Sequence, residues 1–265
     1  MTMLTVTGLY RYPLKSCRGQ SLTDGRLIRY GLEWDRQWMI VDDKGRFLSQ
    51  RRLPAMALID AEPVSEGLIL QAPDRAPLTV GTKPDSIRKV RVWGDEPLAD
   101  DLGDQAADWL SEYLGIACRL VTRGSAFTRP VDPDYDRWDS EVQFADGFPL
   151  LLISQASLDD LNSRLPEPVP MNRFRPNLVV SGCEPYAEDQ WQQIEIGGIT
   201  FEVVKPCSRC TIPQVDQATG ERGDEPTRTL ATYRRRTDKK IYFGQNLIHR
   251  GVGQISLNDP VIVVR

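Results

Sequence analysis

Two cysteines, Cys207 and Cys210, are the residues of this 265-residue chain whose type and spacing are best suited to chemistry. They follow the strongest predicted strand, and Arg209 lies between them. A nearby cation favours the thiolate form of cysteine, which is the form that ligates metals and attacks electrophiles. Segment 205–210 is therefore expected to carry a metal ligand or a nucleophile.

Three other interpretations of this cysteine pair stay open on the residues alone. A structural zinc site needs four ligands, and the remaining candidates are the single histidine, His249, and three scattered cysteines, Cys17, Cys118 and Cys183. A thioredoxin-like redox pair should open a helix, whereas residues 211–213 are predicted to be extended and broken by a proline. Two buried cysteines without a chemical role are the third alternative.

The loop at 13–19, which follows the first predicted strand, has the composition of an anion-binding loop. It contains Lys15 and Ser16. An ammonium group, a hydroxyl and backbone N–H groups together suit a phosphate. The alternative is a solvated turn, which is the more common role of such a loop taken alone.

Three arginines and one aspartate lie in segments that suit contact with a polar cofactor. Arg173 and Arg175 flank Phe174 just before a predicted strand, and guanidinium groups bind phosphate or pterin-like carbonyl and amide edges well. Arg36 lies between a carboxylate and aromatic residues, where a structural salt bridge is the alternative. Asp146 precedes an apolar strand and either contacts a cofactor's amide donors or caps a turn.

The elements that must position these residues are mostly short β-strands. In the first hundred residues they are predicted at 5–12, 38–41, from 47, and at 58–62, 67–71, 78–80 and 88–93, with a hairpin turn at 42–45. Many short strands separated by glycine and proline are typical of a barrel or sandwich.

Helical spacing of apolar residues predicts two helices, at 101–116 and 154–165. Asp100 or Asp101 is expected to cap the first, and Ser157 with Asp160 to form a capping box in the second. Between them, residues 122–144 are expected to form a long polar loop, and loops of that length often carry function.

The β pattern returns from residue 177. Strands are predicted at 178–180, 194–196 and 199–203 and as two short segments within 255–264, with one short helix at 227–235. The predicted fold class is therefore α+β and β-rich. We expect an N-terminal β-barrel-like domain over residues 1–95 and a second β-barrel domain with peripheral helices over residues 96–265.

Composition and charge exclude several classes of protein. The chain is 40% hydrophobic and 26% charged, with a net charge of −4 that gives no reason to expect nucleic-acid or membrane-surface binding. No apolar run approaches the roughly 20 residues that span a bilayer, and no secretory signal is visible. A soluble, cytoplasmic protein with free thiols is expected. A single histidine and the absence of Gly-rich phosphate loops argue against common hydrolases and nucleotide-binding enzymes.

The ordered segments of the chain resemble a known family. YPLKSCRG and GLEWDRQWMIVDDKGRFLSQR are similar to the N-terminal β-barrel domain that precedes MOSC domains. FADGFPLLLISQASLDDLN, NRFRPNLVVSG, PYAEDQW, CSRCTIPQVDQATGER and FGQNLI are similar to the MOSC domain itself. The resemblance covers essentially the whole chain, and it is greatest to the mitochondrial amidoxime reducing components and their bacterial counterparts.

The resemblance implies roles for individual residues. Cys210 matches the thiolate ligand of molybdenum, and Ser208 lies in the same metal-proximal loop. Lys15 and Ser16 match residues that hold the cofactor's phosphate and pterin. The resemblance also implies a further phosphate contact at Arg36, a pterin-side contact at Arg175 and proton delivery near the metal by Asp146, whereas Cys207 and Cys183 match cysteines that do not bind the metal.

The activity implied by the resemblance is reduction of small N-hydroxylated compounds at a molybdenum cofactor. The cofactor carries out the redox step, while the protein supplies the thiolate, the orientation and a proton source. The chain shows no cysteine run typical of an iron–sulfur cluster, so a separate flavin or iron–sulfur protein is the expected electron donor. The alternative is a cofactor- or sulfur-carrier module without turnover. The physiological substrate and the oligomeric state are not readable from the sequence.

Overall fold

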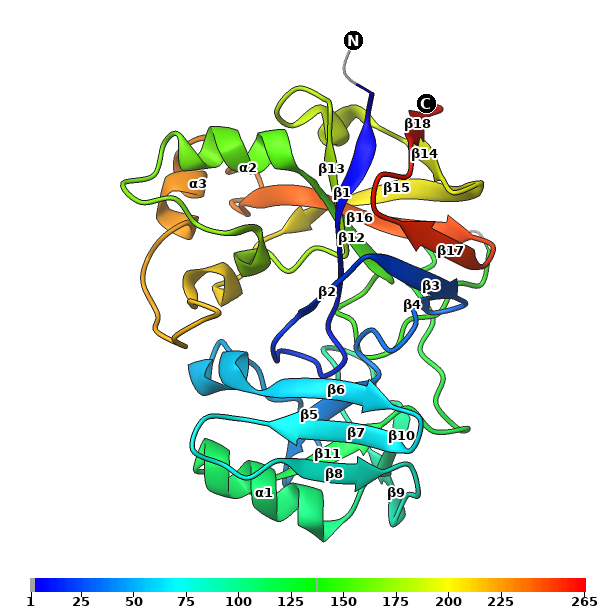
Figure 1. Ribbon diagram of the computed structural model, residues 1–265, viewed down its shortest axis with the longest axis vertical. Helices are drawn as coiled ribbons and strands as arrows, with labels where there is room; N and C mark the ends of the chain where they lie inside the picture. Colours follow the sequence, from blue (N-terminus) through cyan, green and yellow to red (C-terminus); the bar gives the residue numbers. More distant parts are fainter. Residues whose placement is uncertain (1–2, 137) are drawn as a thin grey trace.

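The computed structural model describes residues 3–136 and 138–265, in which the strands form four sheets with a few helices at the periphery. This confirms the β-rich α+β class. Figure 1 shows the sheets gathered into two bodies, one above the other.

An eight-stranded sheet forms the upper body of Figure 1, in the order β18-β14-β15-β16-β12-β13-β1-β2. All neighbours in it are antiparallel except β12 and β13. The strands are β1 (Thr5–Arg11), β2 (Gln20–Leu22), β12 (Leu150–Ser154), β13 (Leu178–Ser181), β14 (Gln193–Ile196), β15 (Ile199–Ser208), β16 (Tyr242–Arg250) and β18 (Val261–Val263).

Smaller elements complete this upper body. They are a three-stranded sheet of β17 (Gly253–Ser256), β3 (Asp24–Ile28) and β4 (Gly31–Leu32), the helices α2 (Gln155–Asn162) and α3 (Thr227–Tyr233), and the 3-10 turns η2 (Met171–Arg173), η3 (Ala187–Gln190) and η4 (Ile212–Gln214).

The lower body contains two sheets and one helix. The elements are β5 (Trp38–Asp42), β11 (Cys118–Thr122), β10 (Leu98–Asp101) and β9 (Ser86–Lys89) in one sheet, β6 (Asp60–Val64), β7 (Gly67–Gln71) and β8 (Leu78–Gly81) in the other, with η1 (Pro54–Leu58) and α1 (Asp104–Leu114). Each body has its own apolar core, built around Ile40, Leu68 and Leu110 below and around Leu152 and Phe201 above. Two bodies, each with its own core, therefore meet at the boundary that we call the seam.

Several local predictions agree with the structure. The turn after β5 is present, with Val41 bridged to Phe47 and Gly45 at a φ of 72°. The predicted helices correspond to α1, α2 and α3. Gly197 and Gly198, both at positive φ, connect β14 to β15 as a tight hairpin. No strand or helix runs through residues 123–149 in the part that the structure describes.

Three local predictions were wrong. Helix α2 is capped by Ser154, whose hydroxyl accepts a hydrogen bond from the Ser157 N–H, because the helix starts earlier than the proposed capping box requires. Helix α1 follows Gly103 without a side-chain cap. Residues 212–214 form the turn η4 and not an extended segment, because the proline sits near its start, where a missing N–H is tolerated.

The division of the chain into domains is less simple than a cut at residue 95. Strands β10 and β11 pair within the sheet of β5, and α1 packs on β11. Conversely, β1 pairs with β13 and β3 with β17 in the upper body. We therefore propose that the lower body extends to about residue 122 and that the first strands belong to the upper body.

None of the described helices combines the length and the apolar composition needed to cross a membrane.

Candidate functional site

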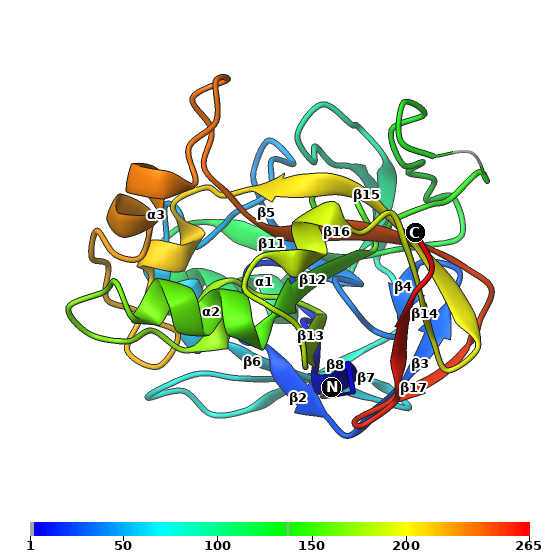
Figure 2. The same ribbon diagram turned by 90° about the horizontal axis from the view of Figure 1, so that it is seen from above.

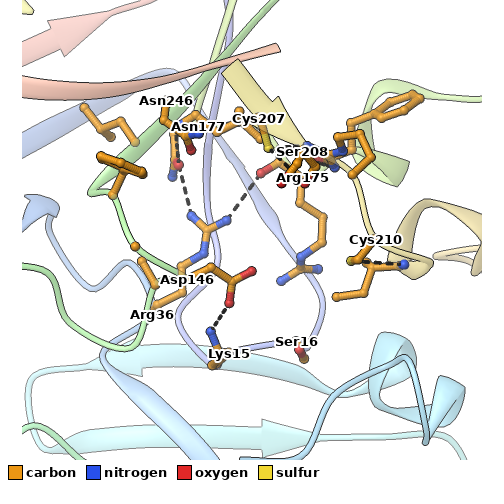
Figure 3. A pocket seen from close by; sticks show the side chains of 18 residues that line it. Lys15, Ser16, Arg36, Asp146, Arg175, Asn177, Cys207, Ser208, Cys210 and Asn246 are labelled. Carbon is orange, nitrogen blue, oxygen red and sulfur yellow. Dashed lines mark hydrogen bonds and ion pairs between the residues drawn. The ribbon is translucent and has the colours of Figure 1, made fainter. Parts of the chain in front are cut away.

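A pocket at the seam between the two bodies collects most of the residues that the sequence singled out. Its walls come from the loop after β1, the segments that precede β5, β12 and β13, and the end of β15. Figure 3 shows the side chains of these segments converging. Among the lining residues are Lys15, Ser16, Arg36, Asp146, Arg175, Ser208 and Cys210.

The pocket has a small inner part and a wide outer part. The inner part, of about 130 Å³, lies against Lys15, Arg36 and Arg175. The outer part, which we call the vestibule, has a volume of about 970 Å³. Both are lined by residues 146–148 and 207–210, so Cys210 lies where the two meet.

Cys210 is exposed, two residues beyond the end of β15. Its Sγ accepts the Ile212 N–H at 3.5 Å and lies 3.8 Å from Nη1 of Arg51. Cys207 is half-buried within β15, and its Sγ accepts a hydrogen bond from Nη1 of Arg209 at 3.1 Å. The two sulfurs therefore differ, since one faces open space and the other is held by Arg209.

The structural zinc site, one of the competing interpretations of the cysteine pair, finds no support in the described part of the chain. All five cysteines are free there. No group of three or more histidine, cysteine or acidic side chains within residues 3–136 and 138–265 is arranged to hold a metal ion. A zinc-stapled scaffold would need such a group.

Lys15 is buried in the wall of the pocket, and its ammonium group is bound to the segment that precedes β12. Its Nζ donates to Oδ1 of Asp146 at 2.5 Å and to the carbonyl of Phe144 at 2.6 Å. Burial lowers the pKa of Lys15 to about 8, although the nearby Asp146 carboxylate opposes that shift. Lys15 is therefore a cation at neutral pH that loses its proton under mildly alkaline conditions.

Asp146 is exposed to the pocket and ionised at neutral pH. Crowding by the pocket walls raises its pKa, but the charge and hydrogen bond of Lys15 and a hydrogen bond from Nε1 of Trp93 outweigh this effect. The net result is a pKa below the usual range. An ionised carboxylate accepts protons and orients donors, so Asp146 is not itself the group that releases a proton at neutral pH.

Tyr12, which the sequence did not single out, separates the two arginines of the pocket. The guanidinium groups of Arg36 and Arg175 each lie 4.2 Å from the centre of its ring. Its hydroxyl donates to the carbonyl of Pro176 at 2.9 Å. The aromatic ring attracts both cations, so two groups that would repel each other are held against the same side chain.

The two arginines differ in their partners. Arg36 forms an ion pair of 2.6 Å with Asp35 and donates to Oδ1 of Asn177 at 3.0 Å. Arg175 is buried, and within the described residues its side chain donates to the Cys17 carbonyl and the Gln217 amide oxygen and forms no ion pair. Burial lowers the pKa of Arg175 to about 10, so it remains charged at neutral pH. A buried cation without a counter-charge is costly unless an anion binds beside it.

Three of these residues have a backbone conformation that L-residues seldom adopt. Ser16, Arg36 and Arg175 have φ values of 63°, 48° and 58°. Such conformations persist only where the surrounding structure enforces them, and they gather at ligand sites. Their coincidence in one pocket supports a binding role for its walls.

Arg173 does not belong to this pocket, although the sequence suggested that it would. Its guanidinium donates to the carbonyl of Pro213 at 2.8 Å and pairs with Asp216 at 2.8 Å. These contacts brace the segment that follows Cys210. Arg173 therefore stabilises the conformation of the loop that contains Cys210, on the side away from the pocket.

The lower body also holds this loop, through residues that the sequence did not indicate. The amides of Gln50 and Gln217 exchange two hydrogen bonds, of 3.1 and 2.9 Å. The side chain of Arg222 donates to the carbonyls of Gln50 and Arg51. The position of Cys210 consequently depends on both bodies.

The arrangement fits a molybdenum cofactor with a terminal phosphate. One end of the pocket presents the cations Lys15, Arg36 and Arg175 and suits an anion, and the other end presents a thiol that suits a thiophilic metal. Nε of Arg209 is buried and has no hydrogen-bond partner in the described structure, so this N–H group is available to a ligand.

The fold and this pocket define a class of β-rich proteins with a thiol-bearing, cation-lined seam, and comparison identifies the family. The MOSC N-terminal beta barrel domain matches residues 3–117, and the MOSC domain matches residues 139–262. The chain belongs to the MOSC-domain family, in the form in which the N-terminal β-barrel domain precedes the MOSC domain, as the resemblance predicted.

Curated relatives match over nearly the whole chain. Mitochondrial amidoxime-reducing component 1 of Homo sapiens is 33% identical and covers 98% of this chain and 83% of its own length. The protein of the same name from Mus musculus is 35% identical, covering 98% and 82%. Molybdenum cofactor sulfurase of Danio rerio is 34% identical over 93% of this chain but only 32% of its own length.

Proposed function

We propose that this protein is a molybdenum-cofactor-dependent reductase of small N-hydroxylated compounds. The observation that carries the proposal is the pocket that has both the exposed thiol of Cys210 and the buried cation Arg175, which forms no ion pair among the described residues, in its lining. The chain's similarity to amidoxime-reducing components supports the reaction class.

Each of these pocket residues has a proposed contact with the cofactor. Cys210 is the proposed metal ligand, with Ser208 beside it. Lys15, Ser16 and Arg36 would hold the phosphate, and Arg175 would contact the pterin side. When bound, the molybdenum cofactor supplies the two-electron chemistry that cleaves an N–O bond.

Protons are handled by the pair of Lys15 and Asp146. The net reaction, R–NHOH plus two electrons and two protons giving R–NH₂ and water, needs a proton source close to the vestibule. Lys15, with a pKa of about 8, can release a proton, and the ionised Asp146, which accepts its hydrogen bond and lines the vestibule, would hold the ammonium group in position. The electrons are proposed to come from a separate flavin or iron–sulfur protein.

The direct test is cofactor content. Protein made in cells that synthesise the molybdenum cofactor should contain about one molybdenum and one pterin per chain. Cys210→Ala should lose the metal, whereas the matched control Cys207→Ala should retain it, because the sulfur of Cys207 is turned to Arg209. The wild type should reduce benzamidoxime with a reduced dye. Loss of metal in Cys207→Ala only, or protein that contains neither metal nor pterin, contradicts the proposal.

A carrier role is the second candidate. The exposure of Cys210 at the vestibule also suits a thiol that accepts sulfur or hands on a cofactor, and the similarity to molybdenum cofactor sulfurase favours this reading. Stable retention of molybdopterin through purification together with turnover of benzamidoxime would exclude a carrier without turnover.

A further inference from the structure

The vestibule in front of Cys210 has a chemical character that the proposed reaction does not require. Its walls include the cations Arg51, Arg129, Lys205, Arg209, Lys239 and Lys240 and the carboxylates Asp95, Asp132 and Asp146. The chain as a whole has a net charge of −4. The positive charge of the vestibule is therefore a local feature.

Internal pairing leaves an excess of positive charge in this space. Asp95 pairs with Arg129 at 2.7 Å, and Asp146 pairs with Lys15 at 2.5 Å. Among the described residues, Lys205, Lys239 and Lys240 form no ion pair within 4.0 Å, and neither do Arg51 and Arg209. Of the three carboxylates in this lining, Asp132 is the one that forms no ion pair with another described residue.

Two of the free ammonium groups lie on a projecting hairpin. Residues 235–241 form the loop between α3 and β16, closed by a bridge between Arg235 and Ile241. Figure 2 shows this hairpin, in orange, rising on the same side of the molecule as the green loop that follows β11. Lys239 and Lys240 are exposed on it and line the vestibule.

The inner end of the vestibule is aromatic. Trp93 is 50% exposed, although its indole N–H is fixed on Asp146 and Arg51 lies 4.8 Å from its ring centre. Phe148 lines the same space, and its ring and that of Tyr135 pack in an edge-to-face arrangement. Exposed aromatic faces held in place by hydrogen bonds favour planar ligands.

We propose that the vestibule selects planar aromatic N-hydroxylated substrates that carry an anionic group. The ring lies against Trp93, with its N-hydroxyl group towards Cys210, and the anionic group lies towards Lys239 and Lys240. This inference rests on the proposed reductase function and specifies its substrate class. Exposed ammonium groups act through water, so each contributes a modest factor that weakens as salt increases.

The test compares two substrates of the same shape, benzamidoxime and 4-carboxybenzamidoxime, with a reduced dye as electron donor. The wild type should have the higher kcat/KM on the carboxylated substrate, and the preference should diminish with added salt. In Lys239→Gln/Lys240→Gln the ratio of the two kcat/KM values should fall by about tenfold. The control Lys44→Gln/Lys83→Gln removes the same charge from exposed lysines outside the vestibule and should leave the ratio unchanged.

A second arm examines the aromatic wall. In Trp93→Leu, the preference for benzamidoxime over acetamidoxime should fall severalfold, whereas the effect of the carboxylate should remain. The dye assay contains no electron-donor protein. If Lys239 and Lys240 served to bind such a protein, their replacement would leave the ratio of the two kcat/KM values unaltered. An unchanged ratio in the Lys239→Gln/Lys240→Gln variant would therefore show that these lysines do not select the substrate and would overturn the inference.

Failure of this inference is distinguishable from failure of the reductase proposal. If the wild type reduces both substrates with equal kcat/KM, the proposed reductase function is supported and the proposed preference for anionic substrates is contradicted. If neither substrate is reduced, calorimetric binding of 4-carboxybenzamidoxime and benzamidoxime still tests the vestibule. Equal affinities for the two in the wild type would then falsify the selectivity independently of turnover.

Discussion

Nζ of Lys15 lies 2.5 Å from Oδ1 of Asp146, and this contact joins the loop after the first strand to the segment that precedes β12. The pair crosses 131 positions of the sequence. It keeps a buried ammonium group charged and a carboxylate ionised in the same pocket. The pH dependence of the protein should therefore depend on both residues together.

Asp146→Asn should shift the alkaline limb of the activity profile to lower pH. Burial and the cations Arg129 and Arg36 depress the pKa of Lys15 to about 8, while Asp146 raises it. In the wild type Lys15 carries its charge below about pH 8, so activity and phosphate affinity should decline above that value. Without the Asp146 carboxylate the pKa of Lys15 falls further, so activity should begin to decline at a lower pH.

This expectation is checked by kcat/KM for benzamidoxime between pH 6 and 10 and by molybdenum content at each pH. The variant Asp43→Asn, which removes an exposed carboxylate elsewhere, should have the wild-type profile. A profile of Asp146→Asn that merely scales down without a shift would show that the two groups are not coupled.

Tyr12 should contribute both to stability and to the spacing of the two arginines. Tyr12→Phe loses one buried hydrogen bond, to Pro176, and should lower the free energy of unfolding by about 1–2 kcal/mol with the cofactor retained. Tyr12→Leu also removes the ring between Arg36 and Arg175. It should cost roughly 3 kcal/mol and reduce the pterin content. Urea unfolding and pterin fluorescence measure the two effects; equal pterin loss in both variants would point to the hydroxyl instead.

Arg51 should assist the thiol-bearing side of the pocket from the lower body. Its Nη1 lies 3.8 Å from the sulfur of Cys210 and its guanidinium lies over Trp93. Arg51→Met should lower kcat by about tenfold or more, as expected for loss of a charged hydrogen-bonding group. Arg51→Lys should recover part of the rate. Arg52→Met, at the exposed neighbouring position, is the control, and equal losses in both variants would indicate a general disturbance of the loop.

Arg173 should matter for stability and not for cofactor contacts. Its guanidinium serves Pro213 and Asp216 behind the loop of Cys210. Arg173→Met should reduce the free energy of unfolding by about 1–3 kcal/mol because buried carbonyl groups lose their donor. Protein that folds should still bind molybdenum. The contrary result, normal stability with no cofactor, would return Arg173 to the binding site.

Much of the candidate site was already present in short sequence segments. Lys15 with Ser16, the FRPN segment with Arg175, and the CSRC segment with Ser208 and Cys210 each suggested contact with an anionic or metal-containing ligand, and the structure brings them to one pocket. Residues that are close in the chain fix a loop's composition and therefore its chemistry. The resemblance supplied the roles that composition alone left open.

The sequence alone did not distinguish two nearby residues of the same type. Arg173 and Arg175 are two positions apart, and nothing in their types distinguishes them. Residue 173 ends a 3-10 turn, whereas residue 175 has a φ of 58°, which directs its side chain to the opposite side. Which arginine faces the pocket is thus a property of the backbone path.

The sequence by itself determined the chemical inventory: a thiol after a long strand, a basic loop after the first strand, and β-rich patterning throughout. Only the tertiary structure decided that Tyr12 separates two guanidinium groups, that Arg51 and Trp93 reach the thiol side of the pocket, and that Lys239 and Lys240 line its vestibule. These relations depend on pairings between distant strands and on the packing of two cores, and the free energy of such contacts is set by many residues at once.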